Sequence, residues 1–530
     1  MSSRFEFVCP NSGRGARRRQ RDPLRKRQEM CLVPPAYRIS IASLVNGEDD
    51  KHMRLALFTI GCKVNQYETE AIAEKLETLG FERVDFREQA DVYVINTCTV
   101  TGESDRSSRQ AIYRANRRSP DAKIVVTGCY AQLEKEYLES LPGVSLVVMQ
   151  ENKGRLPSLI AGVTGHGARG TGTPAEPIPG GKGQGSRGTG RPATPSPGVM
   201  GQGARGTGSP AEPIPRGKGQ GSRGKEGGDE FFGFGVRGLA KHTRALVKIQ
   251  DGCEKNCAYC IVPFARGRER SREAGQIIAE INDLVDNGYK EVVLTGVHVG
   301  RYNRDGSDLV DLSEKILKET KVERMRYSSI DPNEFTDQLT DFVSENDRIC
   351  RHLHIPLQSG EDALLSRMRR AYSTDEYRAL ADKISDAVPD VLIGADVIVG
   401  FPGETDEQFE NTCQFIRSSP VNYLHVFSYS DRKGTEASSM PDKVPPQVIH
   451  KRSEIMHALG KEKWRSYIQG FVGKTLRVLV ENQRDKKTGM LTGLADNYIR
   501  VLLDGDDSFK NEIIPVQIID RHERRLLGEV

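Results

Sequence analysis

Three cysteines in one short segment constrain this chain more than any other feature of its sequence. They are Cys253, Cys257 and Cys260, in the spacing C-x3-C-x2-C, and the segment offers no fourth cysteine. A structural zinc site takes four protein ligands, and an electron-carrying [4Fe–4S] cluster also takes four cysteines. Three thiolates can instead hold three irons of such a cluster and leave the fourth iron open to a small chelating molecule. The alternative is a zinc site that a distant residue completes.

Length and composition indicate a protein of several domains. The 530 residues allow two to four domains, and the sequence has no apolar run long enough to cross a bilayer. Ten cysteines are too few for a secreted disulfide scaffold of this length, so we expect metal ligation in a reducing, cytoplasmic location. Lys and Arg exceed Asp and Glu in residues 1–52 and 161–240, whereas the rest of the chain is net acidic. Overall charge therefore gives no argument for nucleic-acid binding.

Residues 1–52 are predicted to be a disordered basic extension. The Arg-rich stretch 17–27 lacks the apolar core and the cleavage site of a secretory signal. Strand-like sequence begins directly after Met53, which we take as the functional beginning of the protein. A truncated protein that begins at Met53 should keep the full activity of the whole chain in the same assay. A marked loss of activity would show that the basic extension matters.

Residues 53–161 are predicted to form an α/β domain with a parallel sheet, because short apolar runs alternate with helical stretches. The stretch 67–79 has helical spacing and ends at Gly80, a residue type that commonly follows a helix. The predicted strands are 55–60, 92–95 and 123–126.

A cysteine follows each of these three strands within three residues. These cysteines are Cys62, Cys98 and Cys129. The carboxyl ends of parallel strands lie along one edge of a sheet, where ligands bind, so we expect the three thiols to meet there. This would be a second cluster site with three thiolates. The alternative is that each is an ordinary buried cysteine at a strand end.

Residues 162–238 are predicted to be a disordered insertion between domains. The segment 162–188 recurs as 198–224 with four differences, and both copies are rich in Gly, Pro, Arg and Ser. Such a composition buries too little apolar surface to offset the entropy of ordering. Two copies without a strict Gly-X-Y period fit neither a solenoid nor collagen. We interpret the insertion as a spacer; the alternative is that its arginines contact RNA phosphates.

Residues 239–470 are predicted to form a partial (β/α)6 barrel, because six strand-like runs alternate with helices. Active sites of such barrels gather at the carboxyl ends of the strands, and Cys253 comes just after the first run. The helix after the cysteine segment has apolar residues at helical spacing and ends at Gly288. The predicted strands are 245–249, 292–294, 325–330, 352–355, 395–399 and 423–427.

Residues 471–530 are predicted to form a small all-β barrel. Short alternating runs are separated by turn residues such as Asp504-Gly505. The predicted strands are 475–480, 490–494, 498–502 and 512–519. Basic and acidic residues are equal in number in this region, so electrostatics alone does not make it a nucleic-acid-binding domain.

From residue 53 to the C-terminus, apart from the insertion, the chain resembles the radical S-adenosylmethionine (SAM) methylthiotransferase family. The segments that carry the resemblance are 61–69, 253–268, 352–360 and 396–405. The C-terminal barrel is similar to a TRAM domain, which in this family binds tRNA. Residues 62–69 and 425–435 most resemble the branch that converts N6-threonylcarbamoyladenosine beside the tRNA anticodon to its 2-methylthio form. The alternative within the family is methylthiolation of N6-isopentenyladenosine in tRNA.

The resemblance implies an enzyme with two [4Fe–4S] clusters that uses two SAM per product. It places the radical SAM cluster on Cys253, Cys257 and Cys260, and an auxiliary cluster on Cys62, Cys98 and Cys129. It also implies removal of hydrogen from C2 of adenine and transfer of a methylated sulfur to that carbon. The implied partners are tRNA and an electron donor of the flavodoxin or ferredoxin kind, and no membrane partner is expected.

Five further residues are candidates for the SAM pocket, because they lie at strand ends of the barrel or inside the cysteine segment. They are Tyr259, Gly296, Ser329, Gln358 and Gly400. For the glycines and the serine, the alternative is ordinary turn chemistry, and Tyr259 could either stack on the adenine of SAM or simply pack. Arg266 and Arg268 are candidates for tRNA phosphate contacts or solvated loop charges. A function of another class would be a non-catalytic RNA-binding protein whose cysteines hold structural zinc.

Overall fold

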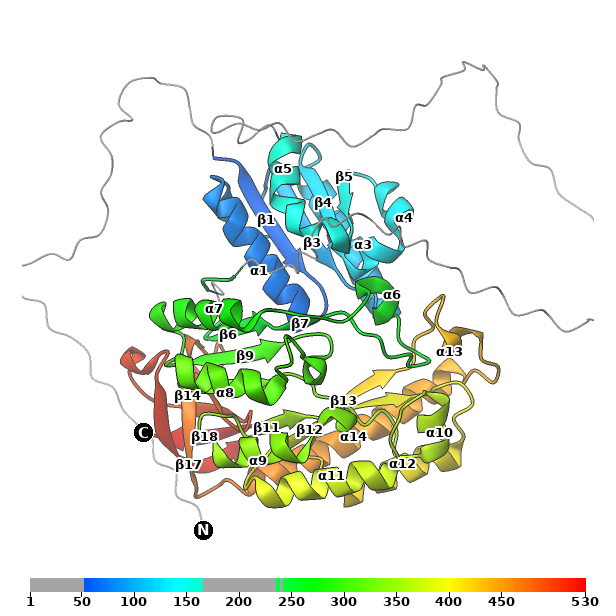
Figure 1. Cartoon of the computed structure of the whole chain (residues 1–530), viewed down its shortest axis with the longest axis vertical. Coiled ribbons are helices and arrows are strands. Elements are labelled where there is room, and N and C mark those ends of the chain that lie inside the picture. The colour runs from blue at the N-terminus through cyan, green and yellow to red at the C-terminus, as the bar shows by residue number, and fades with distance from the viewer. Residues whose placement is uncertain (1–51, 165–234, 239–241) are drawn as a thin grey trace, which may run out of the picture. The chain divides into compact units, whose positions relative to one another are not determined.

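The computed structural model describes residues 52–164, 235–238 and 242–530 (Figure 1). All of these residues belong to one compact unit. Residues 1–51, and residues 165–234 of the predicted insertion 162–238, lie outside the described residues, so the predictions of disorder there stay predictions. An N-terminal parallel sheet, a partial β/α barrel and a C-terminal β-barrel make up the fold, which confirms the predicted fold class. None of the helices in the described ranges is both long and apolar enough to cross a membrane.

The N-terminal sheet is parallel throughout, in the order β2-β1-β3-β4-β5. The three predicted strands form its centre, and the two edge strands were not predicted. Helix α5 continues three residues beyond the expected domain boundary at 161. The strands are β1 (Arg54–Thr59), β2 (Glu82–Val84), β3 (Val92–Thr97), β4 (Lys123–Gly128) and β5 (Val144–Val148). The helices are α1 (Lys63–Thr78), α2 (Gly102–Arg118), α3 (Cys129–Leu133), α4 (Lys135–Glu139), the 3-10 helix η1 (Gln150–Arg155) and α5 (Leu156–Thr164).

The central part contains all six predicted barrel strands, in two three-stranded parallel sheets of order β10-β9-β6 and β11-β12-β13. An isolated parallel bridge between Met325 and Ile349 links the end of one sheet to the segment that enters the other. The strands are β6 (Arg244–Lys248), β9 (Glu291–Thr295), β10 (Arg324–Tyr327), β11 (His352–His354), β12 (Leu392–Val399) and β13 (Tyr423–Ser428).

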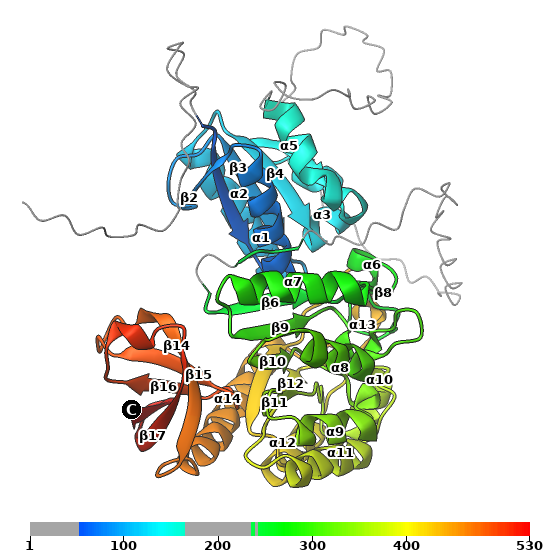
Figure 2. The same ribbon diagram turned by 60° about the vertical axis from the view of Figure 1, so that its left-hand side comes forward.

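Amphipathic helices cover the outside of these strands (Figure 2). Strand β6 shows the packing: Ala245, Leu246 and Val247 belong to the same apolar core as Ile277 and Ile281 of α7. The covering helices are α7 (Ala274–Asp286), α8 (Leu309–Glu319), α9 (Asp337–Glu345), α11 (Thr374–Ala387), α12 (Asp406–Ser418) and α14 (Pro446–Gln469). The cysteine segment lies between β7 (Gln250–Asp251) and α6 (Val262–Arg266), followed by β8 (Arg270–Ser271).

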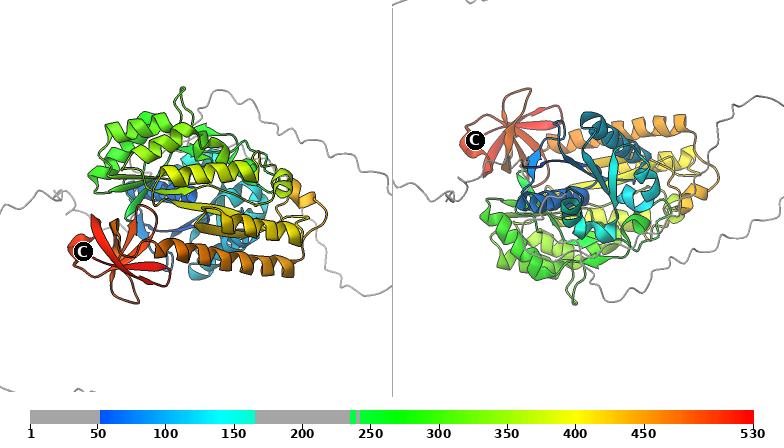
Figure 3. Two further views of the ribbon diagram at one scale, coloured as in Figure 1. Left: turned by 90° about the horizontal axis from the view of Figure 1, so that it is seen from below. Right: turned by 90° about the horizontal axis from the view of Figure 1, so that it is seen from above.

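The C-terminal strands close into a barrel of order β14-β15-β16-β18-β17. Figure 3 shows this barrel in red and orange from two sides. Arg324 and Arg326 attach it to the central part, because they donate hydrogen bonds to the backbone carbonyls of Leu494 and Asp496 at 3.0 and 2.8 Å. Four of its strands were predicted, and β18 was not. The strands are β14 (Thr475–Arg484), β15 (Leu491–Ala495), β16 (Arg500–Leu503), β17 (Ile513–His522) and β18 (Arg525–Glu529).

Candidate active site

The register of the N-terminal sheet brings three cysteines to one edge. Thr59 of β1 pairs with Asn96 of β3, which in turn pairs with Thr127 of β4, so the three strands end level with one another. The cysteines come two or three residues later. Cys62 caps the start of α1, Cys98 follows β3 and Cys129 begins α3.

Two local features hold this cysteine edge in shape. Gly128 has a φ of +100°, and a Cβ on it would lie 2.3 Å from the carbonyl oxygen of Thr97, so only glycine fits directly before Cys129. The Asn65 amide donates to the carbonyls of Ile60 and Thr97 at 2.8 and 3.0 Å, which ties the ends of β1 and β3 together.

The thiols at this edge lie close enough to interact electrostatically. Burial raises the pKa of Cys129 to about 11; Arg266 lowers it, and Cys62 and Cys98 raise it further. Cys98 is also buried, whereas Cys62 is exposed. Three free thiols beside a buried guanidinium form a donor set suited to iron or another soft metal. Metal binding would release their protons.

The second set, in the segment 253–260, is anchored to the barrel by charged side chains. Lys255 forms ion pairs with Asp331 and Glu334 at 2.8 and 3.0 Å. Gly252, directly before Cys253, has a φ of +77°, and a Cβ there would lie 1.8 Å from the carbonyl oxygen of Arg268. The segment is therefore held at the carboxyl ends of the strands, where the sequence placed it.

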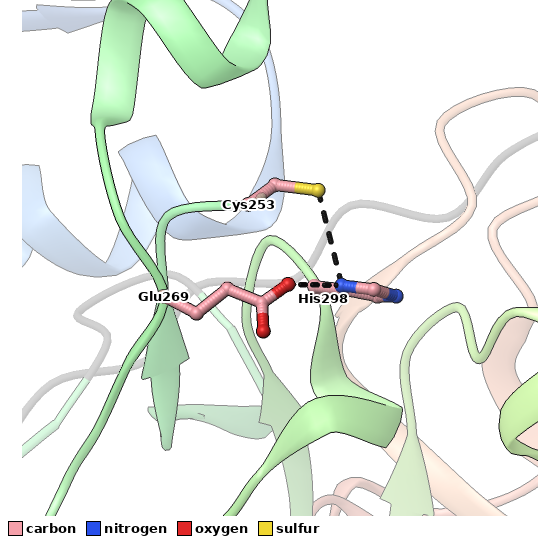
Figure 4. Close-up of side chains that lie close together, drawn as sticks. All are labelled: Cys253, Glu269 and His298. Atoms are coloured by element: carbon pink, nitrogen blue, oxygen red, sulfur yellow. Dashed lines mark hydrogen bonds and ion pairs between the residues drawn. The ribbon is translucent and has the colours of Figure 1, made fainter. Parts of the chain in front are cut away.

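Two cations face the thiols of this segment. Arg370 donates to the Cys257 sulfur at 3.3 Å, and the His298 Nδ1 lies 3.8 Å from the Cys253 sulfur and 2.7 Å from Glu269 (Figure 4). Burial alone lowers the pKa of His298, but hydrogen bonds with Cys253, Glu334 and Glu269 raise it to about 10. Imidazolium and guanidinium charges offset the negative charge that iron-bound thiolates carry, so this donor set fits an iron–sulfur cluster.

Two cavities lie between the cysteine sets. One, of about 180 Å³, is lined by Cys260 and Tyr259 on one side, and by Val100 and Thr101, which follow Cys98, on the other. The other, of about 550 Å³, is lined by Thr99, Tyr130 and Ile261, each of them the sequence neighbour of one of the cysteines. The short helices α3 and α6, which follow Cys129 and Cys260, lie side by side (Figure 1). A single substrate group in either cavity would contact residues that lie next to cysteines of both sets in the sequence.

The five SAM-pocket candidates divide into two groups. Tyr259 and Gln358 line the smaller cavity, and Ser329 lies 2.7 Å from His354, whose other ring nitrogen lies 3.1 Å from Asp396 on the same cavity. Gly296 packs against Gln250, which in turn donates to the Gly252 carbonyl at 2.9 Å. Gly400 packs against Ile449 of α14. Tyr259 and Gln358 thus line one cavity, Ser329 is connected to it through His354 and Asp396, and the two glycines support neighbouring segments.

A buried cluster of charged side chains lies at the site and was not predicted from the sequence. Glu68 of α1 is 1% exposed and binds Lys153 and Lys248 at 2.7 Å each and Arg266 at 3.0 Å. Burial alone would raise the pKa of Glu68, but these cations hold it well below its ordinary value. Asp251 also binds Lys248 and Arg266.

The sequence suggested that Arg266 either contacts tRNA phosphate or is a solvated loop charge, and both interpretations are wrong. Its guanidinium is buried and also donates to the Asn65 side chain at 2.5 Å. From sequence, a charged residue is expected at the surface unless a nearby residue could pair with it. The partners of Arg266 could not be identified in this way, because they lie up to about 200 positions away in the chain. The one local signal is Asp251, an acidic residue two positions before Cys253.

Two protein-family models match parts of this chain. The model of the uncharacterized protein family UPF0004 matches residues 54–149, and the model of the Radical SAM superfamily matches residues 247–416. A threonylcarbamoyladenosine tRNA methylthiotransferase MtaB of Bacillus subtilis is 36% identical over 470 residues, which cover 88% of this chain and 93% of the relative.

Two other similar proteins are more distant. A tRNA-2-methylthio-N(6)-dimethylallyladenosine synthase of Syntrophotalea carbinolica is 29% identical over 89% of this chain and 98% of its own length. Among solved structures, the radical SAM methyltransferase TsrM of Kitasatospora setae aligns with a TM-score of 0.46 and 14% identity over 73% of this chain and 77% of its own.

The fold and the cysteine segment thus define a radical SAM enzyme. Enzymes of this class use SAM and an iron–sulfur cluster as cofactors. The coverage and identity of its relatives narrow the class further. The chain belongs to the MtaB-like radical SAM methylthiotransferase family.

Proposed function

We propose that this enzyme methylthiolates C2 of N6-threonylcarbamoyladenosine beside the anticodon of tRNA. It would hold two [4Fe–4S] clusters and use two SAM for each product. Cys253, Cys257 and Cys260 would hold one cluster, and Cys62, Cys98 and Cys129 the other. The observation that carries the proposal is that residues adjoining both cysteine sets line the same cavities. The names of the MtaB relatives support the choice of nucleoside.

When bound, the clusters and SAM supply radical hydrogen abstraction and a sulfur donor, which an unactivated aromatic carbon requires. The chain's own residues position and shield this chemistry. Arg370 and His298 hold positive charge against the thiols of one set. Tyr259 and Gln358 would line the SAM site, with Ser329 acting through His354. The C-terminal barrel would bind tRNA, and a flavodoxin- or ferredoxin-like protein would supply electrons.

Mass spectrometry of tRNA nucleosides tests the substrate directly. Cells that lack this protein should lose 2-methylthio-N6-threonylcarbamoyladenosine and accumulate its precursor, and restoring the gene should reverse both changes. Loss of the 2-methylthio form of isopentenyladenosine instead would make the second nucleoside the substrate and refute the first assignment.

Metal analysis tests the two-cluster assignment. Protein purified without oxygen should contain about eight iron and eight sulfide per chain, the content of two four-iron clusters. Zinc without brown absorbance would support a non-catalytic RNA-binding protein instead. About four iron per chain would leave only one of the two cysteine sets as a cluster site.

A further inference from the structure

A third cavity, of about 390 Å³, lies where three parts of the chain meet. Helix α1 contributes Lys63 and Gln66, strand β6 contributes Arg244, and the C-terminal barrel contributes Asn482 and Tyr498. The cavity is lined by donors and an aromatic ring, a combination typical of sites that orient a polar ligand.

Positive charge exceeds negative charge around this cavity. Lys63 has no hydrogen bond or ion pair with any residue in the described ranges. Arg244 lies 3.8 Å from Glu291, a carboxylate that already pairs with Arg324 and Arg326 at 2.5 and 2.8 Å. A partly buried ammonium without a counter-ion is unfavourable, and an anionic ligand would remove that cost.

Glu481, the acidic residue of the lining, does not compensate for this excess. Its carboxylate accepts hydrogen bonds from Arg500 at 2.8 Å and from Thr492 at 2.9 Å. Both partners belong to the C-terminal barrel, so the negative charge of Glu481 is already balanced within its own domain.

A buried histidine beside the cavity also lacks a partner. The His352 ring stacks on Tyr498 with ring centres 4.3 Å apart, and His352 is only 5% exposed. Its Nδ1 has no hydrogen-bond partner among the described residues. Most buried polar atoms in proteins are paired, so this nitrogen is a second, independent indication that a polar ligand approaches Tyr498.

The cavity is adjacent to the site of the proposed reaction. Lys63 directly follows Cys62, so its ammonium lies within one side-chain length of the auxiliary cysteine edge. In adenine, C2 and the N6 substituent lie on the same edge, separated by N1. When C2 faces the cysteine edge, an N6 substituent extends along the same side of the ring. The threonylcarbamoyl substituent ends in a free carboxylate, whereas an isopentenyl group is neutral.

We propose that Lys63, assisted by Arg244, binds the carboxylate of the threonylcarbamoyl substituent and thereby selects the modified nucleoside. This inference rests on the proposed function and assigns a specificity-determining residue to it. A site built to pair a charged group discriminates strongly against a substrate that lacks the group, because its own charge is then left unpaired.

Two synthetic anticodon stem-loops test the assignment, one with threonylcarbamoyladenosine and one with its carboxyl methyl ester. The reconstituted wild-type enzyme should prefer the acid in kcat/KM by about 10- to 100-fold. In Lys63→Gln this preference should disappear, because the rate with the acid falls to that with the ester. Lys63→Arg should retain most of the preference. Equilibrium binding of both stem-loops without reductant should show the same pattern.

Lys75→Gln is the matched control, because Lys75 is an exposed lysine on the same helix. It should keep the wild-type preference. Equal wild-type rates with acid and ester would overturn the proposal while leaving the proposed function intact. A Lys63→Gln loss that is equal for both stem-loops would also overturn it, and would point to a backbone phosphate. Activity on isopentenyladenosine stem-loops alone would instead refute the proposed function itself.

Discussion

Replacing Cys98 with alanine should leave this enzyme able to cleave SAM but unable to insert sulfur. Cys98 lies on the N-terminal sheet edge with Cys62 and Cys129, outside the segment 253–260 that we propose to hold the radical SAM cluster. With one of its three proposed ligands removed, the proposed auxiliary cluster should be lost and methylthiolated product should fall by at least about 100-fold. The two readouts are 5′-deoxyadenosine and modified nucleoside, measured in the same reaction.

Cys257→Ala is the reciprocal variant. Its sulfur belongs to the segment that Arg370 contacts, so its loss should abolish both SAM cleavage and product. Cys413→Ala serves as the control, because Cys413 is a fully buried cysteine of helix α12 that belongs to neither set. It should retain both activities. If Cys98→Ala still produced the methylthiolated nucleoside, the auxiliary site would have been assigned to the wrong cysteines.

The central strands of each sheet could be predicted because they are buried on both sides. Their sequences are short apolar runs, as in β3 and β9, where every residue is buried. Strands β2 and β18, which were not predicted, carry no such signal. Strand β2 has only three residues, two of them charged, and β18 mixes charged and apolar residues. Their strand conformation depends on pairing with a neighbour, which a local pattern does not reveal.

The level ends of three parallel strands could be anticipated from sequence, and with them the common edge of Cys62, Cys98 and Cys129. The contacts that join the two cysteine-bearing parts of the chain, and those that surround the second cysteine set, could not be anticipated. Arg266 and Asn65 are about 200 residues apart, yet they share a hydrogen bond. Likewise, Arg370 is not near Cys257 in sequence. The first pair follows from how the sheet and the barrel pack together and the second from packing within the barrel, and both depend on tertiary structure.

Glu68→Gln should destabilise the protein strongly, although it replaces only one side-chain oxygen with an amino group. The Glu68 carboxylate is the main negative charge among Lys153, Lys248 and Arg266, all of them buried. Neutral glutamine would remove one carboxylate from these three cations, and Asp251 would remain paired with Lys248 and Arg266. Breaking a buried ion pair on one side costs about 3–5 kcal/mol, so the free energy of unfolding in a urea titration should fall by that amount.

Because Glu68 lies on α1 while Lys248 and Arg266 belong to the barrel, the same variant tests whether buried charge joins the two cysteine-bearing parts. Glu77→Gln, an exposed change on the same helix, should alter stability by less than about 0.5 kcal/mol. Adding Lys153→Met to Glu68→Gln should recover part of the loss, since one unpaired cation is then removed. If Glu68→Gln unfolded at the same urea concentration as Glu77→Gln, the network would not hold the sheet against the barrel, and apolar packing around Tyr67 and Ile281 would have to do so.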